Sequence, residues 1–182
     1  MDKKNRIKRA YNETADFYNS RYKEIQYEKY RTIFASPYLS AENLKCKILD
    51  LGCGTGLLLE FLKESKLPYI VGIDISAEML KFSKEEKILG DVEMLPFKDN
   101  SFDLAFSFTV IQNLPTLKIL EEVSRILKPD SIFAFTVLKK KLPTKLLQNL
   151  AKNKFTILEK LDSNEDCGFI CRNEKIAIKN KL

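Results

Sequence analysis

A short apolar run that leads into three alternating glycines constrains this chain more than any other feature. The run covers residues 45–51, carries Asp50 near its end, and continues as Gly52-Cys53-Gly54-Thr55-Gly56. Short apolar runs bounded by glycine are typical of buried parallel strands. Glycine tolerates positive φ angles and lets backbone N–H groups approach a ligand closely. The pattern predicts a strand, a glycine loop and a helix that together hold a ligand, rather than a tight turn without one.

Further apolar runs alternate with helical patterns along the rest of the chain. We expect strands at 69–74, 87–91, 102–108, 131–138, 155–161 and 167–171, and helices at 4–35, 57–65, 77–83, 115–128 and 143–152. The first helix is expected to break near Asn19 and Ser20, and Pro129 is expected to stop the fourth. Alternating strands and helices favour an α/β sandwich with a mostly parallel sheet and a closing antiparallel pair.

Length and composition indicate one globular domain. The chain has 182 residues, of which 45% are hydrophobic and 31% charged. No apolar run approaches the roughly 20 residues that span a bilayer. The N-terminus is charged and has no apolar segment behind it, so we expect a cytoplasmic protein. Within the single domain 1–182 we distinguish an N-terminal helical segment at 1–35, a core at 45–172 and a basic tail at 173–182.

The chain contains no histidine, which removes the commonest general base and the commonest metal ligand. It has four cysteines, Cys46, Cys53, Cys167 and Cys171, and neither pair has the C-x2-C spacing of a zinc knuckle. We therefore expect free thiols and no metal site.

The net charge of +6 is concentrated at the two ends of the chain. Residues 1–9 hold five Lys or Arg and one Asp, and residues 139–182 hold eleven Lys or Arg and five acidic residues. Basic ends around an acidic middle are consistent with a surface that binds RNA or another polyanion, but they favour a solvated lysine-rich surface.

Acidic residues follow two more of the predicted strands. Asp74 ends the second strand, where a carboxylate can accept two hydrogen bonds from a ribose diol. Asp91 follows the third strand, where it can meet an exocyclic amine while Val92 packs on a purine face. The alternatives are a helix cap for Asp74, a task that Ser76 already serves, and an ordinary polar loop at Asp91.

These motifs resemble those of the class I S-adenosylmethionine (SAM)-dependent methyltransferases. The matching runs are ILDLGCGTG, VGIDIS-x2-ML, GD-x3-LPF-x4-FD and LKPD, within residues 11–172. The resemblance implies a three-layer αβα sandwich around a Rossmann-like, mostly parallel seven-stranded sheet of order 3-2-1-4-5-7-6, with strand 7 antiparallel. It also implies SAM as cofactor, with the three glycines around its methionine part, Asp74 on its ribose, and residues 108–109 facing the sulfonium.

The N-terminal segment Tyr11-Asn12-Glu13-Thr14-Ala15-Asp16-Phe17-Tyr18-Asn19 resembles the Y-D-x2-A-x2-Y-D segment of the ubiquinone/menaquinone and small-molecule branch of that family. In such enzymes the segment covers the cofactor as a lid, although asparagines replace both aspartates here. Aromatic packing within a helical hairpin is the alternative interpretation. The residues that the family resemblance places at the cofactor are Asp50, Gly52, Cys53, Gly54, Thr55, Gly56, Asp74, Ile75, Met79, Asp91, Val92, Glu93, Phe108, Thr109, Tyr11 and Tyr18.

Three functions compete on this evidence. The first is methylation of a small molecule, with Glu13, Tyr18 and Gln112 as candidate polar groups of the pocket and no catalytic base assigned. The second is methylation of ribosomal or transfer RNA with a small activator subunit. SR-x3-IQ, VGIDIS-x2-ML and FKDNSFD resemble the eukaryotic ribosomal-RNA guanine-N7 methyltransferase, which works with a small zinc-binding activator. The third is a SAM-binding subunit without catalysis.

The sequence FTVIQN after the fourth strand narrows the choice of acceptor. It lacks the N/D-P-P-Y/F/W motif that amino-group methyltransferases use on adenine or glutamine, which argues against those two substrates.

Overall fold

A computed structural model describes residues 2–40, 44–63, 69–84 and 86–175. Its centre is a seven-stranded sheet of order β3-β2-β1-β4-β5-β7-β6. The strands are β1 (Ile48–Leu51), β2 (Ile70–Asp74), β3 (Glu86–Leu89), β4 (Phe102–Phe108), β5 (Leu127–Leu138), β6 (Phe155–Ser163) and β7 (Asp166–Asn173). The first five strands are parallel, whereas β7 is antiparallel to β5 and β6. The predicted strand order is confirmed.

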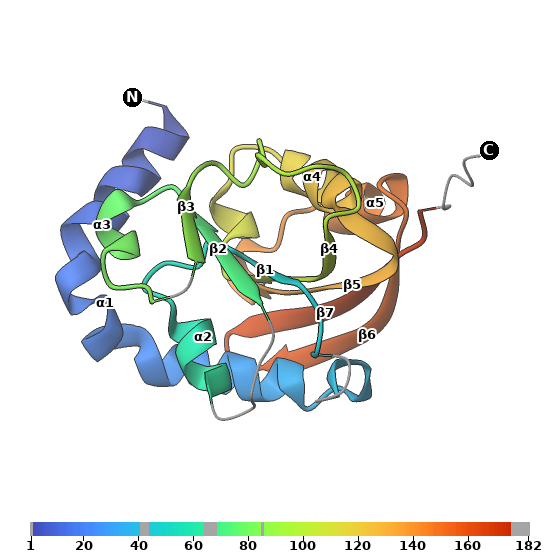
Figure 1. Ribbon diagram of the computed structural model, residues 1–182, viewed down its shortest axis with the longest axis horizontal. Coiled ribbons are helices and arrows are strands. Elements are labelled where there is room, and N and C mark those ends of the chain that lie inside the picture. The colour runs from blue at the N-terminus through green and yellow to red at the C-terminus, as the bar shows by residue number, and fades with distance from the viewer. Residues whose placement is uncertain (1, 41–43, 64–68, 85, 176–182) are drawn as a thin grey trace.

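Helices cover both faces of this sheet, which confirms the three-layer sandwich (Figure 1). They are α1 (Lys3–Phe34), α2 (Leu57–Leu62), α3 (Ala77–Leu80), α4 (Lys118–Ile126) and α5 (Leu146–Lys152). Short 3-10 helices accompany them at η1 (Pro37–Leu39), η3 (Ile111–Asn113) and η4 (Lys139–Lys141). The long α1 passes α3 and α2 and reaches β6 and β7, while α4 and α5 pack on the other side. Among the described helices, none is long and apolar enough to cross a membrane.

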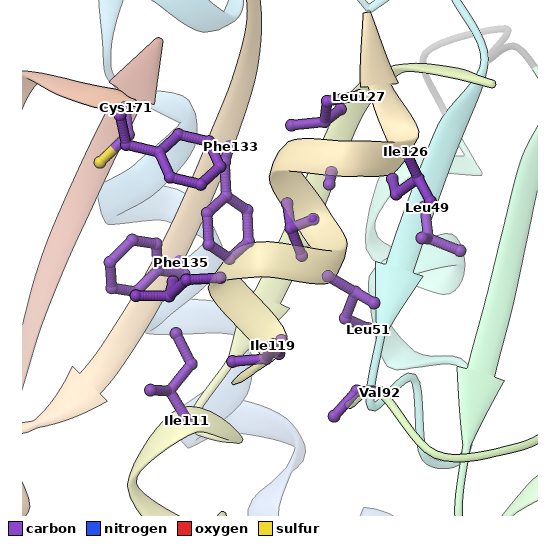
Figure 2. Packing of buried hydrophobic residues seen from close by; sticks show 14 of the residues in the cluster. Leu49, Leu51, Val92, Ile111, Ile119, Ile126, Leu127, Phe133, Phe135 and Cys171 are labelled. Atoms are coloured by element: carbon purple, nitrogen blue, oxygen red, sulfur yellow. The ribbon is translucent and has the colours of Figure 1, made fainter. Parts of the chain in front are cut away.

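The larger core lies between the sheet and the helices α4 and α5. Side chains alternate between the two faces of a strand, so Leu49 and Leu51 of β1 and Phe133 and Phe135 of β5 point to the same side. Figure 2 shows α4 flanked by these two pairs, and all four side chains are fully buried. Burial of a large apolar side chain stabilises a fold by roughly 1.5–3 kcal/mol.

The second core lies between the sheet and the helices α1 and α2. Tyr30 and Ile33 of α1 meet Phe106 and Phe108 of β4 there, and the rings of Tyr30 and Phe108 are 4.5 Å apart. The C-terminal half of α1 is therefore part of the folded core. Its N-terminal half is left to extend past the carboxyl ends of β1 and β2, where the glycine loop lies.

Two of the predicted boundaries are wrong for clear reasons. The helix α1 does not break near Asn19 and Ser20, because Asn19 accepts a hydrogen bond from the Thr55 hydroxyl and Ser20 donates to a carbonyl within the helix. The helix α4 ends at Ile126 rather than at Pro129. Leu127 is already extended and pairs with Phe102, so β5 begins four residues earlier than expected.

The other differences concern element ends. The helix α3 ends at Leu80 instead of residue 83, and α5 begins at Leu146 instead of residue 143. The strands β6 and β7 extend two residues beyond the predicted ends at 161 and 171. Residues 64–65 of the predicted second helix and most of the basic tail at 173–182 lie outside the described residues.

Candidate functional site

The glycine loop is built from three residues with positive φ. Gly52, Gly54 and Gly56 have φ angles of 76°, 55° and 81°. A Cβ on Gly52 would lie 2.4 Å from a methyl of Val110, and one on Gly56 would lie 2.8 Å from the Ser83 hydroxyl. A Cβ on Gly54 would meet nothing within 4 Å. Gly52 and Gly56 are thus required by packing, whereas Gly54 faces open space that a ligand can enter.

Asp74 connects the end of β2 to this loop. Its Oδ2 accepts a hydrogen bond from the Gly54 N–H at 2.9 Å, and its Oδ1 accepts one from the Ser76 N–H at 2.8 Å. Ser76 caps α3 by accepting from the Met79 N–H, so the cap does not require Asp74. Burial raises the pKa of Asp74 above its ordinary value, and the backbone N–H donors oppose that rise. The carboxylate keeps lone pairs for a further donor.

A cavity of about 90 Å³ lies over the carboxyl ends of β1, β2, β3 and β4. Its lining includes eleven residues that the sequence analysis names: Tyr11, Tyr18, Gly52, Gly54, Asp74, Ile75, Met79, Asp91, Val92, Phe108 and Thr109. The glycine loop lies in the middle of the sheet edge, Asp91 follows β3 on one side, and Thr109 follows β4 on the other. Such crevices are where α/β sheets bind ligands.

A second hollow beside the glycine loop is lined by three more of the residues that the sequence analysis names. Asp50, Cys53 and Thr55 line it together with Tyr18 and Tyr30. Gly56 is the N-cap of α2 and packs on Ser83. Glu93 is buried and does not line the cavity, and its N–H donates a hydrogen bond to Asp91.

The N-terminal half of α1 is fixed over the cavity by polar side chains. Asn12 accepts a hydrogen bond from the Ser76 hydroxyl at 2.6 Å, and Asn19 accepts one from the Thr55 hydroxyl. The two asparagines therefore bind the residues that follow Asp74 and Gly54. A neutral amide oxygen suits this role, since an aspartate would add charge beside Asp74.

The first turn of α1 is held by an ion pair. Lys4 Nζ lies 2.5 Å from Asp91 Oδ2 and 2.6 Å from Glu93 Oε2. These hydrogen bonds raise the pKa of Lys4, although partial burial acts in the opposite direction. Lys4 thereby covers the end of the cavity that the sequence assigns to a purine amine.

The loop after β4 is held in a strained conformation. Thr109 has a φ of 60°, which is uncommon for a residue with a branched Cβ. Its N–H donates to Thr136 O at 3.1 Å, and its carbonyl accepts from the side chains of Gln112 and Asn113 at 2.6 and 3.2 Å. Asn113 also donates to the Tyr11 hydroxyl at 3.3 Å.

The two tyrosines of α1 that line the cavity, Tyr11 and Tyr18, are poor bases. Burial raises the pKa of both Tyr11 and Tyr18, and Gln26 donates a hydrogen bond to the Tyr18 hydroxyl. Both remain protonated near neutral pH. Of the other candidate polar groups, Glu13 is exposed and paired with Arg9, so it lies outside the cavity. Gln112 donates a hydrogen bond to the Thr109 carbonyl oxygen.

The sequence interpretation missed six lining residues: Lys4, Ile7, Gly90, Val110, Asn113 and Leu114. Gly90 and Val110 are neighbours in sequence of Asp91 and Thr109, so including one more residue beside each predicted site residue would have found them. Lys4 and Ile7 lie on α1 about 85 residues from the loop after β3 that they cover. Helical periodicity gives no signal for that contact.

Among the described residues, the four cysteines form no disulfide. Burial raises the pKa of Cys46 to about 11 and that of Cys171 to about 12. Within the described part of the chain, no group of three or more His, Cys, Asp or Glu is arranged to hold a metal ion.

Comparison with known proteins shows which protein family the chain resembles. Residues 49–135, which run from β1 into β5, match the model of a methyltransferase domain. The chain is 37% identical over 185 aligned residues to the uncharacterized protein MJ1252 of Methanocaldococcus jannaschii, covering 97% of this chain and 70% of that protein. It is 30% identical to the malonyl-[acyl-carrier protein] O-methyltransferase of Pectobacterium atrosepticum, covering 74% of this chain and 54% of that enzyme.

Solved structures share the fold at low sequence identity. One is the complex between the Haloferax volcanii Trm112 methyltransferase activator and a proposed methyltransferase. Its matching chain superposes with a TM-score of 0.76 at 17% identity and covers 91% of this chain and 98% of that one. Another is an S-adenosylmethionine-dependent methyltransferase from Mesorhizobium loti, with a TM-score of 0.68 at 18% identity over 80% of this chain and 97% of that one. The chain spans 26–57% of the length of several of its curated relatives, the Pectobacterium enzyme among them.

Proposed function

The chain belongs to the SAM-dependent methyltransferase family, and we propose that its methyl acceptor is a small molecule. One observation carries the proposal: α1 lies across the cavity and is attached there through Lys4, Asn12 and Asn19. An acceptor has to fit beneath this helix. Single small molecules meet that requirement more easily than a folded nucleic acid does.

The residues of the cavity fit SAM. Gly54 leaves room for a ligand against the loop, and Asp74 retains acceptor capacity for ribose hydroxyls. Val92 is a buried apolar surface beside Asp91, which suits a purine face and its amine. When bound, SAM supplies an electrophilic methyl group on a positively charged sulfur.

The chain's own residues then have to bind SAM and the acceptor, orient the two toward each other and exclude water. Tyr11, Tyr18 and Phe108 surround the end of the cavity beyond the glycine loop and keep it largely apolar. Tight positioning in such a place converts a bimolecular reaction into an effectively unimolecular one. We assign no general base, since the tyrosines there are held protonated.

The N-terminal segment supports the small-molecule branch of the family as the finer assignment. Tyr11 and Tyr18 both reach the cavity, as lid contacts in that branch would. We therefore propose residues 1–35 as the lid segment, with its N-terminal half as the part that covers the cavity, and 45–172 as the catalytic core, and we extend the cofactor site to Lys4 and Asn113.

A second candidate is methylation of RNA together with a small activator protein. The fold shared with the Trm112-bound chain favours it. Lys139–Lys141 also follow β5 at the edge of the sheet that holds the cavity. Two of these lysines already form ion pairs, Lys139 with Asp162 and Lys140 with Glu165. They are therefore less available to bind the phosphates of RNA.

Methyl transfer from tritiated SAM into extract of the native host tests the choice. We expect label in the small-molecule fraction, unchanged by ribonuclease. Label in RNA that ribonuclease removes would establish the second candidate, and a requirement for an added activator would show up in the same assay. If the protein binds SAM but labels no fraction, it is a non-catalytic SAM-binding subunit.

A further inference from the structure

A buried ion pair links α1 to the sheet beside the cavity. Lys29 of α1 and Asp166 at the start of β7 are 6% and 2% exposed, and Lys29 Nζ lies 3.2 Å from Asp166 Oδ2. The same ammonium donates a hydrogen bond to Thr109 Oγ1 at 3.0 Å. One lysine thus joins a helix, the β7 strand and the strained loop after β4.

Packing alone does not explain this arrangement. A buried ion pair stabilises a fold no better than apolar side chains of similar volume, because both charges lose their hydration. Asp166 Oδ1 and Thr136 Oγ1 are also buried with no hydrogen-bond partner among the described residues. Several polar groups have therefore been placed next to Thr109 where an apolar core would be simpler.

The ion pair determines how the Thr109 hydroxyl can act. An ammonium only donates hydrogen bonds, so the Thr109 oxygen has to accept from Lys29. The hydroxyl keeps one proton of its own to donate. Within the described residues it makes no second hydrogen bond, and Thr109 lines the cavity. Its proton is therefore available to a ligand, and the ammonium behind it strengthens that donor.

Among the described residues of the cavity wall, no carboxylate lies on the Thr109 side, and Asp166 behind Thr109 is paired with the Lys29 ammonium. The carboxylates of the cavity wall are Asp74 and Asp91, which follow β2 and β3, whereas Thr109 follows β4 on the far side of β1. Strands are about 4.8 Å apart, so Asp74 lies about two strand spacings from Thr109. Tyr11 and Tyr18 hold their protons. The nucleophilic atom of the acceptor has to arrive without a proton.

We propose that Lys29, anchored by Asp166, is a positioning residue that presents the Thr109 hydroxyl to a carboxylate of the methyl acceptor. The inference rests on the proposed function and names its substrate class. A carboxylate is ionised at neutral pH and accepts hydrogen bonds only. Its oxygen bonds to the methyl carbon while the carbon–sulfur bond breaks, the electron pair returns to sulfur, and no proton moves. The products are a methyl ester and neutral S-adenosylhomocysteine.

Calorimetry with S-adenosylhomocysteine and simple carboxylates tests the proposal without turnover. Protein saturated with S-adenosylhomocysteine is titrated with malonate, succinate and glutarate, and with the neutral diamide of each. We expect at least one dicarboxylate to bind, and its diamide to bind about tenfold more weakly, as for loss of one charged hydrogen bond. Affinity for S-adenosylhomocysteine is the internal control.

Matched variants separate the roles of the two residues. Thr109→Val keeps the shape and removes the hydroxyl, so we expect about a tenfold loss of carboxylate affinity, whereas Thr109→Ser retains it. Lys29→Met alone leaves Asp166 buried and unpaired, so the folding control is the double variant Lys29→Met/Asp166→Asn. It should bind S-adenosylhomocysteine as the wild type does and bind the carboxylate about as weakly as Thr109→Val does.

The outcomes distinguish the two levels of the proposal. If the wild type fails to bind S-adenosylhomocysteine, the proposed function is wrong. If it binds that ligand but no dicarboxylate at millimolar concentration, only the carboxylate inference is wrong. Equal binding of acid and diamide, or unchanged carboxylate affinity in Thr109→Val, likewise overturns it. A double variant with wild-type carboxylate affinity would limit Lys29 to holding α1 in place.

Discussion

Asp74 Oδ2 accepts a hydrogen bond from the backbone N–H of Gly54 at 2.9 Å, which ties the end of β2 to the middle of the glycine loop. The other oxygen is held by the Ser76 N–H. Both oxygens are thus oriented by backbone donors that cannot turn away, so the remaining lone pairs keep a fixed direction. Such preorganisation favours ligand binding because little ordering is left to the moment of association.

Replacing Asp74 should weaken cofactor binding. In Asp74→Ala the ribose hydroxyls lose their acceptor, and in Asp74→Asn the amide N–H₂ is forced toward a backbone donor. We expect either change to lower S-adenosylhomocysteine affinity by roughly 1.5–3 kcal/mol, or tenfold to about a hundredfold. Calorimetry measures the loss, with Asp99→Asn on the exposed surface as matched control. If Asp74→Asn keeps the wild-type affinity for S-adenosylhomocysteine, Asp74 does not contribute to ligand binding.

The raised pKa of Asp74 should make ligand affinity and stability respond oppositely to pH. Burial lifts it above the ordinary value of 3.8, so the folded protein binds more protons than the unfolded chain between these two values. The contribution of Asp74 to stability is therefore complete below pH 3.8 and is lost as pH rises through the folded pKa. Ribose hydroxyls need the ionised acceptor, so affinity should fall as pH drops through that pKa.

Asp74→Asn is the control for both trends. It should flatten the acidic limb of the S-adenosylhomocysteine affinity profile and the matching part of the thermal stability profile. Two profiles that keep their wild-type shape in this variant would assign the pH dependence to another group.

Gly54→Ala and Gly56→Ala should differ in what they damage. Both residues have positive φ, so alanine at either position adds strain of about 1–2 kcal/mol. At Gly56 the new methyl also meets Ser83, so the loss should appear as a lower melting temperature. At Gly54 the methyl enters the open space of the cavity, so S-adenosylhomocysteine binding should suffer most. Equal loss of affinity in both variants would contradict this division.

Much of the fold could be predicted because local chemistry and tertiary structure agree. Apolar runs bounded by glycine become the parallel strands, and Asp74 and Asp91 reach one edge because carboxyl ends of parallel strands lie together. The boundary at Pro129 failed because pairing of Leu127 with Phe102 ends the helix before proline can. That pairing joins residues 25 positions apart, beyond the reach of a local pattern.

The contacts of α1 could not be predicted for a similar reason. Helical periodicity tells which face of α1 is buried but not where along the sheet the helix lies. Lys4 meets Asp91 across 87 positions and Lys29 meets Thr109 across 80. The expected break at Asn19 failed because its side chain bonds to Thr55 and not to its own backbone.

The cysteines should be unreactive, and ligand binding should not depend on metal. Burial puts the pKa of Cys46 at about 11 and that of Cys171 at about 12, so both are neutral thiols near pH 7.5. Only the thiolate is a good nucleophile or zinc ligand. We expect iodoacetamide to alkylate these two far more slowly in the folded protein than in urea. S-adenosylhomocysteine affinity should survive EDTA, and stoichiometric zinc by elemental analysis would contradict this expectation.

The asparagines of α1 should control how fast the cavity opens. A cavity of about 90 Å³ is smaller than the roughly 300–1,000 Å³ of usual ligand sites, so the N-terminal half of α1 has to move to admit SAM. Asn12→Ala and Asn19→Ala each remove one of the hydrogen bonds that hold it. Together they should favour the open state by roughly 1–3 kcal/mol.

Hydrogen exchange and stopped-flow dissociation measure that opening. In the double variant we expect faster exchange of the first turns of α1 and faster release of S-adenosylhomocysteine, by about tenfold or more. The exposed Asn5→Ala on the same helix controls for the higher helix propensity of alanine. The C-terminal half of α1, held by Tyr30 and Ile33 in the core, should keep its protection. If exchange accelerates equally over both halves, α1 unfolds or detaches as a whole instead of opening at its N-terminal end.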